Sequence, residues 1–478
     1  MKRFVFVWMT VISIILTACS SQPSDLSDKL EKYAVPINQL TIPDGVQIIG
    51  LGEASHNNSE FQSVRLDVLK VLVEKYGVRT LVLEEEFANS ELMNRYLSGE
   101  DIELQDVWQS WFPFYRTEEM AALFNWMREY NRSVSSEEQL QYWGMDVQQP
   151  SMILYFLDKY LQETDRDLYK ELNNLRITHN QRIQLNKQLM GISTPGRYQA
   201  MNEKDYMKFQ KKWSLKLQND IRKIETLMDK MNSDADHLIS MSSKQSYEIA
   251  IQNARSIYSI YSSINDSLQQ DYSEGHGFLF SSSNSNNRDA AMKEKVDWIL
   301  NQANGPILVV GHNGHISKKM KQGDYIAQSA LSSGISIDGD KLETVYLGEL
   351  LKENYGDAYY TIGTSFNEGA LASFSMILMD ENPPTFIGRS DNILLNSFMK
   401  LPEDAYFLDF DRSKQDKKLK QLLTKEELKM PYFGSLDGID LNDPKNRNMD
   451  DYQLAITLDD TYDALINFRK ANLFTPYR

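Results

Sequence analysis

Two short histidine-bearing segments hold the residues best suited to catalysis in this sequence. Residues 52–56 contain Glu53 and His56, and residues 311–315 contain His312, Asn313 and His315. An imidazole, with a reference pKa near 6.5, can take a proton from water at neutral pH. A carboxylate on its other ring nitrogen would fix the tautomer, while a second imidazole could stabilise an oxyanion or protonate a leaving alcohol. Three of the six histidines lie in these two segments, so we predict a site that activates water for hydrolysis.

Two further charged residues, Glu84 and Arg65, are predicted to join this site. Glu84 is the first residue of an acidic triplet, residues 84–86, and it directly follows an apolar run, which predicts that it lies at the edge of the sheet. The alternative for the whole triplet is a strand end exposed to solvent. Arg65 lies four residues from both Phe61 and Leu69, which places it on or beside the apolar face of a helix. A charge buried there needs a partner, and the Glu53 or Glu84 loop could supply one. The alternative is that Arg65 extends along the apolar stripe to the surface.

The elements that must position these residues are parallel strands. Residues 46–51, 78–83 and 307–310 are short apolar runs typical of buried strands, and each is followed directly by candidate site residues. Further strands are predicted at 142–147, 342–346, 358–364 and 464–468. Strands that alternate with helices favour an α/β fold with a mostly parallel central sheet flanked by helices. In such sheets ligands bind beyond the carboxyl ends of the strands, where all three segments would meet.

Helical signals divide the chain further. Residues 59–76 are predicted to form a helix, with a capping box of Ser59 and Gln62 and a stop at Gly77. Residues 41–149 and 275–478 carry the α/β pattern, whereas residues 150–274 lack strand signals. We therefore predict a large inserted all-helical subdomain at 150–274, which could act as a lid. A Ser/Asn-rich loop at 281–287 and a helix at 288–302 are expected after it.

The first residues of the chain predict a compartment. Lys2 and Arg3 precede a short apolar run that ends in Leu-Thr-Ala-Cys19, which resembles the lipobox of bacterial lipoproteins. The prediction is a signal peptide at 1–19, a lipid anchor at Cys19, a tether at 20–40 and an extracytoplasmic location at the bacterial cell membrane. The alternative is an ordinary secretory signal or a buried anchor helix. Cys19 is the single cysteine, so lipidation would exclude disulfides, cysteine nucleophiles and thiolate metal sites.

The composition indicates the class of protein and excludes some kinds of binding partner. The 478 residues are 41% hydrophobic and 25% charged, which is typical of a globular protein and long enough for several domains. The net charge of −16 disfavours nucleic acid as a partner. A serine hydrolase is disfavoured because no Gly-x-Ser-x-Gly elbow is present.

At these residues the sequence resembles the erythromycin esterase family, over roughly residues 46–470. The resemblance lies in an ordered set of segments rather than in one motif: Ile49-Gly50-Leu51-Gly52-Glu53-Ala54-Ser55-His56 with Glu60 and Phe61, Leu83-Glu84, Gly144-Met145-Asp146, Arg288-Asp289 with Met292 and Trp298, Gly311-His312-Asn313-Gly314-His315, and Tyr462-Asp463-Ala464-Leu465-Ile466.

The resemblance implies a hydrolase that needs no metal and opens macrolide lactones with an activated water. His56 would be the general base, and Glu53, Arg65, Glu84, His312 and His315 would line the site, in a deep cleft between the α/β core and the insertion. Arg65 and Asn313 are assigned to substrate binding, and the substrate is a small-molecule ester or lactone.

Two other functions remain open from the residues. The wider superfamily includes haem-binding envelope lipoproteins, and a histidine and glutamate cluster could hold haem or iron. A divalent ion held by His56, Glu84, His312 and His315 would make a metal-dependent hydrolase. No cofactor is required by the preferred interpretation, although a divalent metal is compatible with the residue types.

Overall fold

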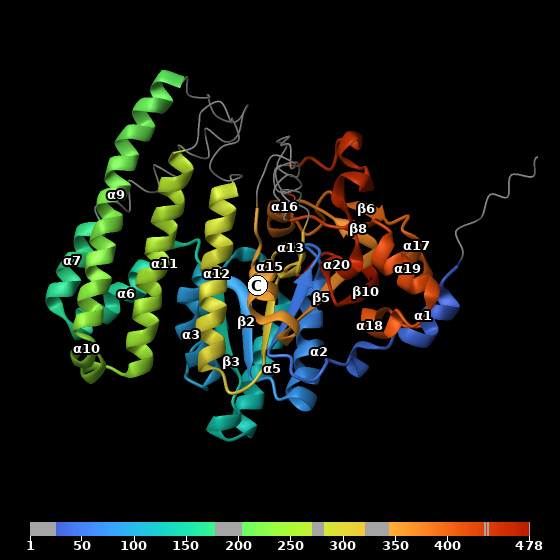
Figure 1. Ribbon diagram of the computed structural model, residues 1–478, viewed down its shortest axis with the longest axis horizontal. Helices are drawn as coiled ribbons and strands as arrows, with labels where there is room; N and C mark the ends of the chain where they lie inside the picture. Colours follow the sequence, from blue (N-terminus) through green and yellow to red (C-terminus); the bar gives the residue numbers. More distant parts are fainter. Residues whose placement is uncertain are drawn as a thin grey trace, which may run out of the picture.

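One twisted eight-stranded sheet organises the protein (Figure 1). The computed structural model describes residues 25–176, 203–269, 282–320, 344–434, 436 and 439–477. The sheet is built from β1 (Ile48–Glu53), β2 (Thr80–Glu86), β3 (Gln141–Asp146), β4 (Ile307–His312), β5 (Tyr359–Leu371), β6 (Phe386–Arg389), β7 (Ala405–Asp409) and β10 (Ala464–Ala471). A second sheet pairs β8 (Leu428–Pro431) with β9 (Gln453–Ile456).

The strand order is β3-β2-β4-β1-β5-β10-β7, with β6 paired to β5. Neighbours from β3 to β10 run parallel, whereas β7 and β6 are antiparallel. The sequence therefore predicted the mostly parallel sheet correctly. The order places β4 beside β1, although more than 250 residues separate them in the chain, and the register pairs Glu53 with His312.

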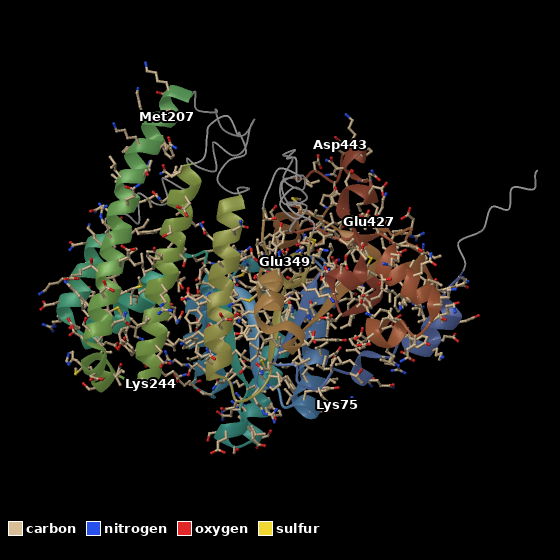
Figure 2. The ribbon with its side chains drawn as sticks, viewed as in Figure 1. Lys75, Met207, Lys244, Glu349, Glu427 and Asp443 are labelled. Atoms are coloured by element: carbon tan, nitrogen blue, oxygen red, sulfur yellow. The ribbon has the colours of Figure 1, made fainter. Side chains whose placement is uncertain are left out.

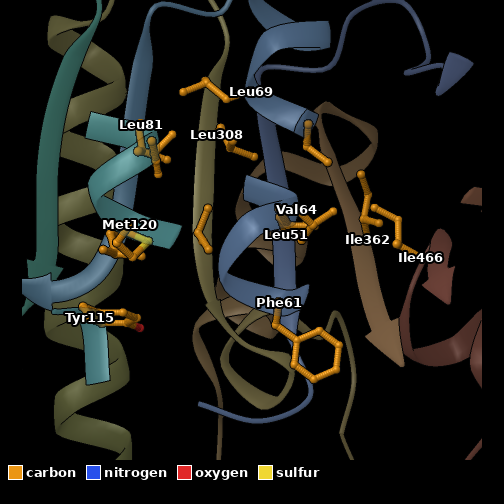
Figure 3. Close-up of a cluster of buried hydrophobic side chains, with 14 of the residues drawn as sticks. Leu51, Phe61, Val64, Leu69, Leu81, Tyr115, Met120, Leu308, Ile362 and Ile466 are labelled. Atoms are coloured by element: carbon orange, nitrogen blue, oxygen red, sulfur yellow. The ribbon is translucent and has the colours of Figure 1, made fainter. Parts of the chain in front are cut away.

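Helices cover both faces of this sheet, because successive strand residues point to opposite sides and both sets are apolar. One face carries Leu51, Leu81 and Leu308 and packs on α2 (Ser59–Tyr76) and α5 (Glu118–Ser133), as Figure 3 shows. The other face carries Val82 and Val309 and packs on α12 (Ser282–Gln302) and α15 (Leu347–Tyr355).

The remaining helices of the α/β part are short. They are α1 (Ser27–Tyr33), α3 (Ser90–Leu97), α4 (Leu104–Val107), α13 (Asn313–Ile316), α16 (Phe374–Met379), α17 (Ile393–Phe398), α18 (Phe410–Ser413), α19 (Lys417–Lys425) and α20 (Leu458–Thr461).

A helical insertion stands beside the sheet at its β3 edge (Figure 1). It comprises α6 (Pro150–Thr164), α7 (Arg166–Arg176), α9 (Glu203–Ser233), α10 (Ala235–Met241) and α11 (Lys244–Leu268). Their apolar stripes form a core of their own, in which Leu157, Leu227 and Tyr261 are buried. Figure 2 marks Met207 towards one end of the insertion and Lys244, the first residue of α11, at the other. The sequence predicted this helical unit correctly from the loss of the strand pattern.

Several local predictions were wrong. A loop was expected at 281–287, but α12 begins at Ser282. Serine and asparagine have only a modest helix-forming cost, which the packing of the later turns of the same helix can offset. The strand expected at 342–346 is absent from its described residues 344–346, which lead into α15. By contrast, the predicted helix stop is confirmed, because Gly77 ends α2 in a left-handed conformation with φ of 70°.

The predicted capping box of α2 was also wrong. Asn58 is the N-cap, and no side chain caps it. The Ser59 hydroxyl instead donates to Glu119 at 2.5 Å, and the Gln62 amide donates to the His56 carbonyl at 3.3 Å. Both side chains are bound to tertiary partners that the local pattern does not reveal.

Within the stretch predicted as a tether, residues 20–40, the described residues belong to the fold. Residues 27–33 form α1, whose Leu30 and Tyr33 are buried against the α17 side of the sheet. Asp25 also pairs with Lys400 at 2.5 Å. The folded part therefore begins by Asp25. The predicted signal peptide, Cys19 and residues 20–24 lie outside the described residues. Within the described ranges, no helix is long and apolar enough to cross a membrane.

Candidate active site

The carboxyl ends of β1, β4 and β2 bring the predicted residues together. β1 ends at Glu53, β4 ends at His312, and β2 runs parallel to β4 with Leu83 opposite Val310. The Glu84 carboxylate accepts the backbone N–H of His312 at 2.7 Å. The strands thus converge where ligands of parallel sheets bind.

Glu53, His56 and Arg65 form the centre of the site. Oε1 of Glu53 lies 2.6 Å from Nδ1 of His56, and Oε2 accepts a hydrogen bond from the Arg65 guanidinium. Burial alone raises the pKa of Glu53, but the charges of Arg65 and His56 outweigh this effect, so the pKa lies below its usual value. Since an ionised Glu53 only accepts hydrogen bonds, Nδ1 of His56 carries the proton, and Nε2 keeps a free lone pair.

The His56 ring is held between aromatic side chains. It stacks on Phe114, with ring centroids 4.6 Å apart and planes inclined by 15°. The His312 ring lies on another side, with centroids 5.3 Å apart. The Tyr115 hydroxyl donates to Oε1 of Glu53 at 3.4 Å, and its ring lies beneath the Arg65 guanidinium. The His56 side chain is still 13% exposed, whereas those of Glu53 and Arg65 are 1% exposed. His56 is therefore the member of this trio that a substrate can reach.

His312 is a buried neutral imidazole. Its Nδ1 accepts the N–H of Gly314 at 3.3 Å, and its Nε2 faces the Phe433 carbonyl at 3.3 Å. This pattern places the proton on Nε2. Burial, with a smaller effect of His56, lowers the pKa of His312 to about 3. At neutral pH His312 is therefore a hydrogen-bond donor beside His56 and carries no charge.

A second charged cluster lies beyond His312 and centres on Arg288. Its guanidinium donates to Glu84 at 2.8 Å, to Asp146 at 2.7 Å and 3.0 Å, and to Nε2 of His315 at 2.9 Å. Nδ1 of His315 lies 2.7 Å from Asp289. Burial raises the pKa of Glu84, but His315 and Arg288 outweigh it, and the pKa lies well below its usual value. The Arg288 side chain is 21% exposed, so one cation of the cluster is accessible to a ligand.

His315 has two competing neighbours at Nε2. Arg288 donates to this atom at 2.9 Å, which requires a free lone pair, whereas Glu84 lies 3.4 Å away and would accept a proton from it. The contact with Arg288 suits the neutral ring, whereas the contact with Glu84 suits the protonated ring. Burial lowers the pKa of His315, yet Asp289 and Glu84 outweigh burial and raise it. His315 can therefore take up a proton more readily than His312.

The acidic triplet is not a solvated strand end. Glu84, Glu85 and Glu86 are all buried, because a register shift between β2 and β3 turns them towards different partners. Glu85 accepts the backbone N–H groups of Glu86 and Phe112, each at 2.9 Å. Glu86 accepts the backbone N–H groups at 148 and 149, just before α6. Of the three, Glu84 alone reaches the site residues, as the sequence predicted.

Arg65 and Asn313, which were assigned to substrate binding, are both hydrogen bonded to other residues of the protein, although Nε of Arg65 has no partner among the described residues. Arg65 is buried, and besides Glu53 it donates to Gln62 at 2.7 Å. The Asn313 amide donates to the Thr364 carbonyl at 2.9 Å and accepts the Thr364 N–H at 3.1 Å. These contacts give Arg65 the role of orienting Glu53, and Asn313 that of joining α13 to β5. Arg65 does not extend to the surface.

Several residues that contact the site residues were not predicted from the sequence. Arg288, Asp146 and Asp289 stood only among the family-like segments and had no role assigned. Phe114 and Tyr115 were not predicted to contribute to the site. Asp146 ends β3, so the rule that found Glu53 and Glu84 would also have found it. No local signal marks the others, because their partners lie far away in the chain.

The metal and haem alternatives gain no support from the donor set. In the described ranges, no three His, Cys, Asp or Glu side chains are grouped so that they could hold a metal ion. The nitrogens of His312 and His315 face hydrogen-bond partners rather than a shared point. The cleft implied by the resemblance stays a prediction. A cavity of about 470 Å³ does lie between α3 and the insertion, but none of the site residues lines it.

Comparisons with known proteins place this geometry in context. A family model described as erythromycin esterase matches residues 73–471. A relative from Escherichia coli described as erythromycin esterase type II is 23% identical over 335 residues, covering 68% of this chain and 70% of the relative.

Solved structures share the fold. A Bacillus cereus protein aligns with a TM-score of 0.65 at 20% identity, over 95% of this chain and 98% of the other. A succinoglycan biosynthesis protein gives 0.64 at 17% identity, over 95% and 98%. A mutant of the erythromycin esterase EreC in its open conformation gives 0.56 at 17% identity, over 90% and 91%. At these identities the likeness extends to the fold alone.

Proposed function

The chain belongs to the erythromycin esterase family, and from this premise we propose that it hydrolyses a carboxylic ester or a lactone with a water molecule activated by His56. Family membership supports ester hydrolase activity in general. The activated water and the kind of substrate are our own inference. The observation that carries it is the 2.6 Å contact between Glu53 and Nδ1 of His56, since it leaves Nε2 as an available base.

In the proposed reaction, Nε2 of His56 takes a proton from water while the water oxygen bonds to the carbonyl carbon. Glu53 stabilises the resulting imidazolium, and Arg65 holds Glu53 in place. The tetrahedral intermediate then expels the alkoxide, which takes the proton back from His56. The products are a carboxylic acid and an alcohol, so atoms and charge balance. The Arg288 guanidinium, which is 21% exposed, is assigned to the oxygen that gains negative charge. The Nε2–H of His312 would join it by turning from the Phe433 carbonyl to the ligand.

The macrolide lactones are the first substrates to examine, because the Escherichia coli relative is described as an erythromycin esterase. We expect the purified protein to hydrolyse at least one member of a panel of macrolides, simple lactones and p-nitrophenyl esters. Intact-protein mass spectrometry during turnover should detect no acyl adduct, because water rather than a side chain attacks the carbonyl. Activity should persist after extensive treatment with EDTA.

Three results would contradict parts of this proposal. A stable acyl adduct would replace the activated water with a covalent nucleophile. Loss of activity on chelation, with recovery on adding Zn²⁺, would favour the metal-dependent alternative. No hydrolysis across the panel, together with a Soret band on adding haem, would favour a haem-binding protein.

We also propose that Cys19 carries a lipid and holds the protein at the extracytoplasmic face of a bacterial membrane. The support is the Leu-Thr-Ala-Cys19 segment after a short apolar run. When the full chain is expressed in bacteria, an alkyne analogue of palmitate should label the wild type and bring it into the membrane fraction. The Cys19→Ser variant should be unlabelled, and labelling that persists in it would refute the anchor.

A further inference from the structure

The cavity beside α3 lies away from the hydrolytic site. It is lined by α3, β3, α6, α10 and α11, it opens to solvent, and its volume is about 470 Å³. Trp143, three residues before the site residue Asp146 on β3, forms part of its floor. A smaller adjoining cavity of about 180 Å³ reaches Gln141, the first residue of β3. The space therefore extends towards the amino-terminal end of the strand, whereas the site lies at the carboxyl end. Its volume is within the range of small-molecule pockets.

A buried amide at this cavity lacks a partner. Asn253 on α11 lines the cavity and is 2% exposed, and Oδ1 of its side chain accepts no hydrogen bond from any group that the structure describes. A buried polar atom without a partner is destabilising, since it has lost its hydrogen bonds to water. Neighbouring buried polar groups, such as Gln252 with Lys295 at 2.8 Å, are paired. Other buried polar atoms of the described residues also lack a partner, but Asn253 lines this cavity, where a bound molecule could supply one.

The rest of the lining combines aromatic rings with uncharged polar groups. Trp143, Phe156 and Tyr160 supply the rings, and the side chain of Gln245 supplies a further amide. The Asn94 amide also lines the cavity, but it is paired with the backbone of Tyr142 at 2.7 Å and 2.9 Å. An amide group offers both a donor and an acceptor, which suits a hydroxyl group that can also do both. Aromatic faces suit the apolar C–H face of a saturated ring.

The charges around the cavity cancel. Arg95 and Lys159 are positive, whereas Glu91 and Glu163 are negative. Lys159 and Glu163 are exposed, so they lie where the cavity opens to solvent. Arg95 is also paired with Glu100 at 2.7 Å, outside the lining. The lining therefore lacks the excess of positive charge that an anion would need, and its mixed charges favour a neutral ligand.

We propose that this cavity is a binding site for a neutral hydroxylated ring compound the size of a mono- or disaccharide. Asn253 would hydrogen bond to a ligand hydroxyl, and the wall of Trp143, Phe156 and Tyr160 would pack on the ligand's C–H face. Because α3 and β3 belong to the sheet domain and α6 and α11 to the insertion, the ligand would contact both units. This site is independent of ester hydrolysis.

The test measures binding of four sugars to the purified protein by saturation-transfer NMR and calorimetry. Glucose and cellobiose are the neutral probes, and glucosamine and glucuronate carry opposite charges. We expect at least one neutral sugar to bind saturably, and more tightly than its charged counterparts. Asn253→Leu should weaken binding by roughly tenfold through loss of a buried hydrogen bond. Ser246→Trp, which places a large ring at the exposed rim, should abolish it.

Two matched variants distinguish binding in this cavity from binding elsewhere on the protein. Tyr155→Ala changes an aromatic residue on α6 that is 58% exposed and does not line the cavity, and it should leave binding unchanged. His56→Ala should also retain binding. If Asn253→Leu fails to fold, Ser246→Trp alone decides. The proposal is overturned if none of the sugars binds, if a charged sugar binds best, if binding survives Ser246→Trp, or if His56→Ala abolishes it.

Discussion

His56→Ala should lower kcat for an ester substrate by roughly 10²- to 10⁴-fold, the usual contribution of a general base. The physical reason is that Nε2 of His56 carries the free lone pair of the Glu53–His56 pair, and its side chain is 13% exposed. Removal of the imidazole leaves an ion pair of Glu53 and Arg65 that cannot take a proton from water. Initial rates on the most reactive ester of the panel would measure the loss.

The matched control is His237→Ala, since His237 is an exposed histidine on α10, outside the site. It should leave kcat unchanged. Circular dichroism and thermal unfolding of both variants would show that the fold persists. An active His56→Ala variant would remove His56 from the reaction and direct attention to the Arg288 cluster.

Arg65→Met should reduce the free energy of unfolding by about 3–5 kcal/mol, because it leaves Glu53 buried and ionised without its partner. Both side chains are 1% exposed, so water cannot replace the guanidinium. Urea unfolding at neutral pH would measure this change. The surface control is Arg132→Met, which breaks the pair with Glu129 at side-chain exposures of 54% and 67%. Such an exposed pair contributes only about 0–1 kcal/mol.

The double variant Arg65→Met with Glu53→Gln distinguishes stability from catalysis. It should recover much of the lost free energy, since no uncompensated charge remains buried. It should not recover activity, because His56 then lacks the carboxylate that orients it. If the double variant is as unstable as Arg65→Met, packing rather than charge explains the loss.

The same ion pair predicts how stability depends on pH. A carboxyl whose pKa is lowered on folding stabilises the protein above its unfolded pKa, about 4.3 for glutamate. That stabilisation is lost as the pH falls through the lower folded value. The wild type should therefore lose part of its unfolding free energy below about pH 4.3, and Arg65→Met should lose less because the guanidinium that lowers the pKa of Glu53 is gone.

The short-range features of the fold were predictable from the sequence. The apolar runs predicted six strands of the main sheet, and Gly77 was correctly predicted to end α2. The loss of strand signals correctly predicted where the helical insertion lies. Glu53, Glu84 and His312 were found because they directly follow such runs. The strands extend further than predicted, so Glu53 and His312 are themselves the last strand residues. Predictions that depended on local side-chain bonds, such as the capping box, were wrong.

The sequence by itself determined the residue types and the strand ends on which they lie, because periodicity and apolar runs are local properties. It placed Arg65 on or beside an apolar helix face, and the tertiary structure decided that Arg65 is buried. The tertiary structure decided that β4 inserts between β1 and β2, which pairs Glu53 with His312 and brings Glu84 to the His312 backbone. It also decided that Arg288 links Glu84, Asp146 and His315, and that Phe114 stacks on His56. Glu84 and His312, for example, are 228 positions apart in the chain. Such contacts arise from strand order and helix packing, which depend on the whole core rather than on any single segment.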